Sequence, residues 1–176
     1  VVRNPLQGVD AFPNYKDEYY GSGPLTKGEI GCFMSHWSVW KHAQSKGFKR
    51  ILVFEDDVAF GDSDKDSLFA DALRERLNEM DNRISPRLGV SWDLLYLSHK
   101  YIEDFVNQAV LLSRHISIPT FTSWTLAYVI NDSGIEKFLK PQPEKRIIPA
   151  DDYFNLMGGQ MKRFVTDRYD PFFDGA

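Results

Sequence analysis

Only one cysteine, Cys32, occurs among the 176 residues, so the chain can form no internal disulfide bond. No apolar run approaches the roughly 20 residues that a membrane-spanning helix needs, and no signal peptide is visible. The formal net charge of −4 argues against nucleic-acid binding, which usually needs a strongly basic face. A glycine-rich phosphate loop of the Walker or dinucleotide-binding type is also absent, which argues against ATPases and dehydrogenases.

The length and composition of the chain fit one globular domain. Hydrophobic residues make up 43% of the sequence, enough to bury one core, and we expect a single domain over residues 1–176. The chain starts at Val1 without an initiator methionine or a recognisable start of a helix or strand. We therefore expect it to be a fragment of a longer protein.

The clearest feature is an apolar strand pattern that ends in three acids, RILVFEDD at residues 50–57. An unbroken apolar run predicts a strand buried on both faces, as in a parallel sheet covered by helices. Ligands of such sheets gather beyond the carboxyl ends of the strands, where Glu55, Asp56 and Asp57 would lie. Adjacent carboxylates repel one another, and a divalent cation with oxygen ligands, such as Mg²⁺ or Mn²⁺, would compensate them. A solvated turn is equally consistent with these residues alone.

Helix and strand patterns alternate along the rest of the chain. Thr26 and Glu29 have the spacing of a capping box, which predicts a helix to about Lys46, ended by Gly47. The apolar pattern predicts a helix after residue 66 and a strand over 92–97. Residue types typical of strands predict another strand over 121–130, and a capping residue at 132 or 133 predicts a short helix there. This alternation is typical of an α/β fold.

Two further positions could meet a ligand. Lys100 follows the strand over residues 92–97, where a cation could bind an anionic group, although an ordinary surface lysine fits equally well. Asp151 and Asp152 form a second acidic pair after another short apolar run.

Two acidic clusters on an α/β pattern favour transfer chemistry at a diphosphate. A cation held by one cluster would absorb the charge of a departing diphosphate, and a carboxylate of the other could remove a proton from an incoming hydroxyl. The arrangement fits glycosyl transfer from a nucleotide sugar. From the residue pattern alone, nucleotidyl or phosphoryl transfer fits nearly as well.

Five motifs occur in order along the chain: LTKGEIGCFMSH at 25–36, VFEDDV at 53–58, WDLLYL at 92–97, WTLAY at 124–128 and PADDY at 149–153. Together they resemble the signature of glycosyltransferase family 25, and the resemblance runs from about residue 8 to residue 152. Within that family, the sequence resembles most the second glycosyltransferase domain of procollagen galactosyltransferases and their cell-adhesion-named relatives.

The resemblance implies a GT-A-type, nucleotide-binding α/β fold with a mostly parallel central sheet. It also implies a Mn²⁺-dependent enzyme, with Mg²⁺ as the other candidate cation. Relatives transfer galactose from UDP-galactose to hydroxylysine of collagen and invert the anomeric centre. For this chain, the implied partners are a nucleotide sugar and a collagen-like protein acceptor, and the implied location is the lumen of the endoplasmic reticulum.

The resemblance also assigns roles to residues. Residues 55–57 match the family's metal and diphosphate motif; Glu55 and Asp57 would bind the metal, since side chains two apart on a strand point the same way. Glu55, Asp56 and Trp124, which lie in the matching motifs, are candidates for binding the donor. Lys100 is a further candidate, because of its place after a strand. Asp57 is also a catalytic candidate, together with Asp151, which matches the acid of the later motif and is either the general base or an organiser of ligands.

Two departures from the family pattern limit this assignment. The family's opening strand and helix would lie before Val1, so we expect an N-terminally truncated fold, and the segment after residue 164 follows the pattern poorly. Two alternatives stay open. One is a family 25 transferase for a bacterial or viral glycan, and the other is a non-catalytic adhesion or scaffold homologue, although all the acids of the motifs are present.

Overall fold

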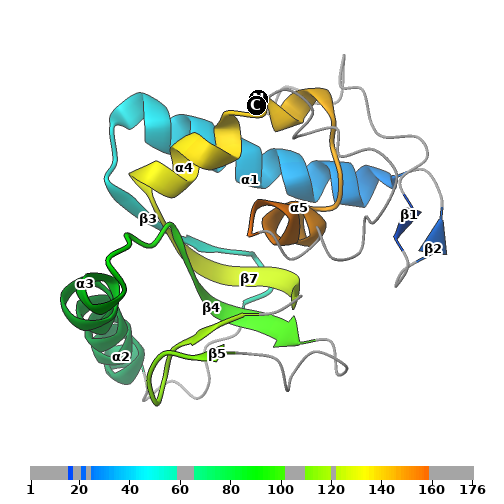
Figure 1. Ribbon diagram of the computed structural model, residues 1–176. Helices are drawn as coiled ribbons and strands as arrows, with labels where there is room; N and C mark the ends of the chain where they lie inside the picture. Colours follow the sequence, from blue (N-terminus) through cyan, green and yellow to red (C-terminus); the bar gives the residue numbers. More distant parts are fainter. Residues whose placement is uncertain are drawn as a thin grey trace. The chain divides into compact units, whose positions relative to one another are not determined.

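The computed structural model describes residues 16–17, 21–22, 25–58, 66–101, 110–119 and 122–158, and the segment after residue 164 lies outside them. The chain divides into two compact units (Figure 1). The helical unit comprises Val1–Lys49 and Asp132–Ala176, and the sheet unit comprises Arg50–Asn131. The single domain predicted over residues 1–176 stays a prediction.

The helical unit is built on α1 (Lys27–Lys46), which begins and ends where the sequence predicts. The Thr26 hydroxyl accepts a hydrogen bond from the Glu29 amide at 3.2 Å, and the Glu29 carboxylate accepts one from the Thr26 amide at 2.6 Å. This reciprocal capping box satisfies two amides of the first turn. Gly47 ends the helix with φ 66°, a left-handed conformation that favours glycine.

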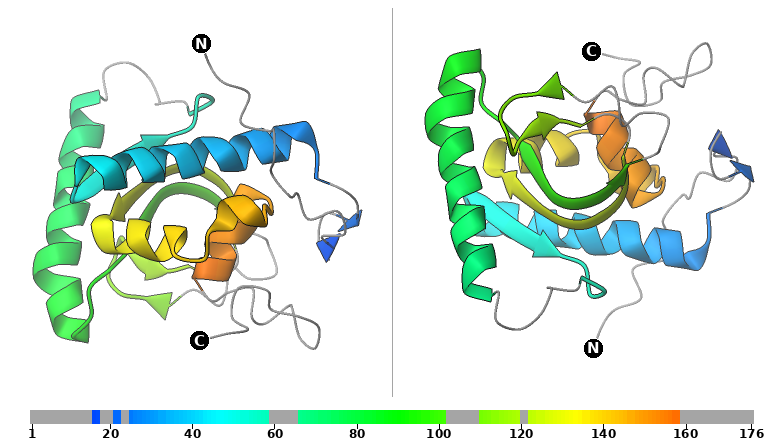
Figure 2. Two further views of the ribbon diagram at one scale, coloured as in Figure 1. Left: turned by 90° about the horizontal axis from the view of Figure 1, so that it is seen from above. Right: turned by 90° about the horizontal axis from the view of Figure 1, so that it is seen from below.

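Two shorter helices, α4 (Asp132–Leu139) and α5 (Ala150–Met157), contact α1, and α4 lies beside it in both views of Figure 2. Between them is the 3₁₀ turn η4 (Pro143–Lys145), whose Glu144 carboxylate accepts a hydrogen bond from the Trp37 indole at 3.1 Å. A two-stranded antiparallel ladder, β1 (Lys16–Asp17) with β2 (Gly21–Ser22), precedes α1.

Aromatic side chains fill the core of the helical unit. Trp40 has no exposed surface and packs edge-on against Phe33 and Phe138, with ring centroids 6.3 and 5.1 Å apart. Tyr153 is equally buried, and its hydroxyl donates to the Phe138 carbonyl. His36 packs against the Trp40 ring. Aromatic side chains of α1, α4 and α5 thus share one core.

The sheet unit contains a three-stranded sheet in the order β3 (Arg50–Phe54), β7 (Thr122–Asn131), β4 (Leu94–Tyr101). Both β3 and β4 run antiparallel to β7, and β4 and β7 follow the same curve in Figure 2. A second ladder, β5 (Val110–Leu111) with β6 (Ser117–Ile118), is also antiparallel. The α/β class is confirmed.

The mostly parallel sheet predicted from the sequence is not what the described strands form. That prediction used the unbroken apolar run of β3 as a sign of burial on both faces. In the structure, β3 is an outer strand of the described sheet, with Leu52 and Phe54 exposed by 40% and 38%. An apolar run reports hydrophobicity but carries no information about strand direction, which depends on the partner strand.

One long helical segment covers apolar side chains of the sheet unit. It consists of α2 (Asp66–Glu79), the π-helical turn η2 (Met80–Ile84) and α3 (Ser85–Leu88), which Figure 2 shows as one continuous rod. The core cluster of this unit consists of Met80, Ile84, Trp92, Ile116 and Val129, with Leu73, Leu77, Leu95, Leu97 and Leu112 packed against it. None of the described helices is long and apolar enough to cross a membrane.

Candidate functional site

The three predicted acids form a turn directly after β3. Glu55 is half-buried, whereas Asp56 and Asp57 are exposed. The Glu55 amide donates to the Leu126 carbonyl at 2.9 Å, which extends the β3–β7 ladder by one bond, and the Val58 amide donates to the Glu55 carbonyl at 3.3 Å. The backbone therefore fixes the start of the acidic turn at the edge of the sheet.

A bulge in β7 lies beside this turn. Lys100 of β4 is paired with Ser123, and Ser98 is paired with Ala127. Three residues of β7, at positions 124–126, thus face the single residue 99 of β4. Bulges of this kind bend a strand and redirect its side chains, and they are frequent next to active sites.

Thr125, inside the bulge, is hydrogen-bonded to the acidic turn. Its hydroxyl donates to Oε1 of Glu55, across 70 positions of sequence. Only 3% of Thr125 is exposed, and Glu55 is half-buried, so the bond is partly shielded from water. This hydrogen bond restricts the orientations of the Glu55 carboxylate.

Trp124 combines exposure with an unusual backbone. It has φ 63°, one of two non-glycine residues with positive φ among the described residues, and it is 55% exposed. A bulky residue in the left-handed region costs of order 1–3 kcal/mol, and such strain concentrates at functional sites. The predicted donor-binding Trp124 therefore neighbours the acidic turn through Thr125. Lys100 has only its backbone described, in β4, and its role in binding stays a prediction.

Asp151 and Asp152 belong to the helical unit, in the first turn of α5. Asp151 is half-buried, and its carboxylate accepts a hydrogen bond from the Asp152 amide at 3.1 Å. Asp152 is only 2% exposed. Acids at this position are favoured by the partial positive charge of a helix N-terminus, which gives the pair a structural role independent of chemistry.

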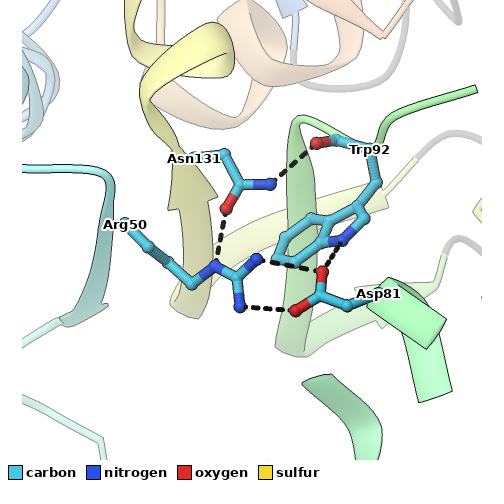
Figure 3. Close-up of polar contacts among 4 residues, drawn as sticks. All are labelled: Arg50, Asp81, Trp92 and Asn131. Carbon is cyan, nitrogen blue, oxygen red and sulfur yellow. Dashed lines mark hydrogen bonds and ion pairs between the residues drawn. The ribbon is translucent and has the colours of Figure 1, made fainter. Parts of the chain in front are cut away.

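The opposite end of β3 is fixed by a polar network (Figure 3). Two nitrogens of Arg50 donate to the two carboxylate oxygens of Asp81, both at 3.0 Å, and the guanidinium lies 4.6 Å from the centroid of the Trp92 ring. Trp92 donates its indole N–H to Asp81 at 2.8 Å, while Asn131 accepts from Arg50 at 2.7 Å and donates to the Trp92 carbonyl at 2.8 Å. The hydrogen bonds from Arg50 hold the pKa of Asp81 below its usual value.

The side chains at the acidic turn suit a hard divalent cation. Glu55 and Asp57 offer carboxylate oxygens, the donors that Mg²⁺ and Mn²⁺ prefer, and the exposure of Asp57 leaves room for water or a diphosphate to complete the coordination. The hydrogen bond from Thr125 fixes one of these two donors.

Sequence reasoning found the acids but missed Thr125. The available signal was a hydroxyl inside the WTLAY motif at residues 124–128, in a strand whose next residues are apolar. The role of this hydroxyl depends on the register of β7 with β3, which cannot be predicted from neighbouring residues.

Comparisons with known proteins point to one family. The family model described as "Glycosyltransferase family 25 (LPS biosynthesis protein)" matches residues 7–154. No solved structure matches the chain.

Individual relatives carry names of two kinds. The chain is 39% identical over 92% of its length to the rat protein named "Probable inactive glycosyltransferase 25 family member 3", and 37% identical over 91% to the human "Inactive glycosyltransferase 25 family member 3". It is also 32% identical over 85% of its length to "Procollagen galactosyltransferase 1" of Danio rerio.

The chain covers 26%, 25% and 23% of these three proteins, so it spans about a quarter of the curated relatives it matches. The family model nevertheless covers most of the chain itself, and it includes the acidic turn, the β7 bulge and Asp151. The chain therefore belongs to glycosyltransferase family 25.

Proposed function

We propose that this chain forms the donor-binding part of a metal-dependent hexosyltransferase. It would act on UDP-galactose and transfer galactose, with inversion, to hydroxylysine of collagen-like acceptors in the lumen of the endoplasmic reticulum. The carrying observation is the acidic turn, where Thr125 and the β7 backbone hold Glu55 beside two exposed aspartates. Family membership supports glycosyl transfer, and the similarity to procollagen galactosyltransferase 1 supports the choice of sugar and acceptor.

Each candidate site residue of the sheet unit has a distinct role in this proposal. Glu55 and Asp57 hold the cation, and Asp56 lies beside the diphosphate. A bound Mn²⁺ or Mg²⁺ supplies positive charge that stabilises the departing diphosphate. The exposed ring of Trp124 offers a flat apolar face for the base or sugar of the donor, and Lys100 adds a cation for its phosphates.

Asp151 is proposed as the general base for the acceptor hydroxyl or as an organiser of ligands. A general base must accept a proton from the attacking hydroxyl, which requires an ionised carboxylate within hydrogen-bond reach. Asp151 lies in the first turn of α5, where acidic side chains are favoured by the helix dipole.

A second candidate function is binding without transfer. Two relatives at 37% and 39% identity carry "inactive" in their names, which favours a homologue that has kept the fold but not the activity. A transferase for a bacterial or viral glycan is the remaining enzymatic alternative, and the family description mentions LPS biosynthesis. Binding and turnover must therefore be measured separately.

The test is thermal unfolding of the chain with Mn²⁺, UDP and UDP-galactose, alone and in combination. A ligand that binds only the folded state raises the unfolding temperature, so a rise with UDP that requires Mn²⁺ is expected. Transfer is then assayed by mass spectrometry with a hydroxylysine-containing collagen peptide and with glycan acceptors. Binding without any product supports the non-catalytic alternative, and no stabilisation by any combination contradicts the proposal.

Asp57→Asn links the binding to the acidic turn. We expect the Mn²⁺-dependent rise with UDP to disappear, while the metal-free unfolding temperature stays the same or increases, because one repelling charge is removed. Asp71→Asn is the matched control, since Asp71 is an exposed acid of α2 that pairs only with Arg74 among the described residues. A marked loss of metal-free stability in Asp57→Asn would instead indicate a structural role.

A further inference from the structure

We propose that Thr125 is a positioning residue, which orients the Glu55 carboxylate for the divalent cation. This inference rests on the proposed function, because it requires that residues 55–57 bind a metal. No motif of the sequence assigns Thr125 such a role; it follows from the hydrogen bond between its hydroxyl and Oε1 of Glu55.

The position of Thr125 makes this bond hard to replace. Thr125 is only 3% exposed, so its hydroxyl is shielded from solvent, whereas Glu55 is half-buried and keeps part of its surface open. The Glu55 backbone is itself tied to β7, through its amide and the Leu126 carbonyl at 2.9 Å. The backbone of Glu55 is thus bound to Leu126 and its side chain to the adjacent Thr125, which restricts the position of the carboxylate before any cation arrives.

The shape of β7 supports a role beyond strand pairing. A regular ladder would place one residue of β7 opposite residue 99 of β4, whereas three residues, at positions 124–126, occupy this place. Trp124, the first residue of the bulge, has φ 63°, a conformation that tryptophan rarely adopts. This strained segment is the one that presents Thr125 to Glu55, and strained backbone of this kind persists where the surrounding structure has a use for it.

The chemistry of a carboxylate permits both interactions at once. An ionised carboxylate has about four lone-pair positions on its two oxygens, so it can accept the Thr125 hydrogen and still bind a cation. Hydrogen bonds to metal-bound carboxylates orient the ligand, and their removal typically weakens metal affinity by about 10- to 100-fold. Thr125→Val keeps the shape of the side chain and removes only the donor, so it should produce a loss of this size.

The experiment is a titration of the chain with MnCl₂, with and without UDP, in which the free Mn²⁺ is measured by electron paramagnetic resonance. Three variants are compared with the original chain: Thr125→Val, Thr125→Ser and Thr122→Val. Thr125→Ser retains the hydroxyl, and Thr122→Val makes the same change at another buried position of β7. Thermal unfolding in EDTA checks that each variant is folded.

We expect Thr125→Val to bind Mn²⁺ about 10- to 100-fold more weakly, with Thr125→Ser and Thr122→Val close to the original chain. Equal affinity of Thr125→Val and the original chain would overturn the inference and leave the proposed metal site intact. An equal loss in Thr122→Val would also overturn it, because the effect would then be a general one of altering β7. If the original chain binds no Mn²⁺ in either condition, the proposed function and this inference both fail.

Discussion

Replacing Asp81 with alanine removes the centre of the network that fixes the start of β3, the strand whose other end carries the acidic turn. The carboxylate of Asp81 accepts two hydrogen bonds from Arg50, at 3.0 Å each, and one from the Trp92 indole at 2.8 Å. Asp81 lies in the π-helical turn η2, a rare element, and its carboxylate points toward Arg50 and Trp92 (Figure 3).

The decrease in the free energy of unfolding expected for Asp81→Ala depends on how exposed the partners of Asp81 are. The side chains of Arg50 and Asp81 are 34% and 38% exposed, so solvent screens the ion pair and its loss costs about 1 kcal/mol, the upper end for exposed pairs. Trp92 is only 8% exposed, and an unpaired buried N–H costs about 1–3 kcal/mol. The free energy of unfolding should therefore fall by about 2–4 kcal/mol.

Asp81→Asn separates these two contributions. The asparagine oxygen can still accept from the Trp92 indole, so only the ion pair is weakened and a loss of about 1 kcal/mol is expected. Asp71→Ala is the surface control; its ion pair with Arg74 is 68% and 69% exposed, and its removal should cost less than about 0.5 kcal/mol. Urea unfolding followed by far-ultraviolet circular dichroism measures all three. A loss below 0.5 kcal/mol for Asp81→Ala, or equal losses for both Asp81 variants, would refute the reasoning.

The same network gives stability a defined dependence on pH. The folded pKa of Asp81 is lower than that of an unfolded aspartate, about 3.9, because Arg50 donates to the carboxylate. The stabilisation is therefore fully present above the unfolded pKa and is lost as the pH falls through the folded pKa. The difference in unfolding free energy between the original chain and Asp81→Asn should stay constant from about pH 7 to pH 5 and shrink below about pH 4. A difference that grows on acidification would contradict this.

Two further predictions concern the aromatic core of the helical unit. Burial raises the pKa of Tyr153, and the nearby charge of Glu144 adds to the effect, so the phenol stabilises the fold below its unfolded pKa of about 10 and opposes folding above it. In urea titrations, Tyr153→Phe should lower the free energy of unfolding by about 1 kcal/mol at pH 7 and by less at pH 11. The same loss at both pH values would argue against a buried phenol donor. Trp40→Ala should lower the free energy of unfolding by about 3–5 kcal/mol in the same assay, because Trp40 is fully buried. Val39→Ala, at the exposed neighbouring position, should lower it by less than about 0.5 kcal/mol. Similar losses for the two variants would show that α1 is not packed as described.

The elements that could be predicted from the sequence are those specified by neighbouring residues. The capping box at Thr26 and Glu29, the glycine stop at Gly47 and the apolar spacing of Phe33 and Trp40 are all local signals, and α1 follows them closely. The acidic turn is predictable for the same reason, since three acids after an apolar run need only their own sequence to be recognised.

Strand direction and partners could not be predicted in this way. The apolar run of β3 is compatible with a parallel or an antiparallel neighbour, and the choice of β7 depends on a segment about 70 positions away. The change from α2 to a π-helical turn could not be predicted either. Met80 continues the helical spacing of Leu73 and Leu77, so the apolar pattern does not reveal the different hydrogen bonding of residues 80–84.

The candidate site shows why acids are easier to find than the groups that orient them. Glu55 and Asp57 are recognisable because carboxylates in a row are costly without a cation, a property of the residues themselves. Thr125 carries no such signal by itself; it becomes a candidate only because the β3–β7 register pairs Glu55 with the neighbouring Leu126 and the Thr125 hydroxyl donates to the Glu55 carboxylate. A homologue could therefore keep every acid of the motif and still bind its cation poorly after a change at this position. If Thr125 positions Glu55 as proposed, the residue at this position should be compared, together with the acids, between the relatives named inactive and those named procollagen galactosyltransferases.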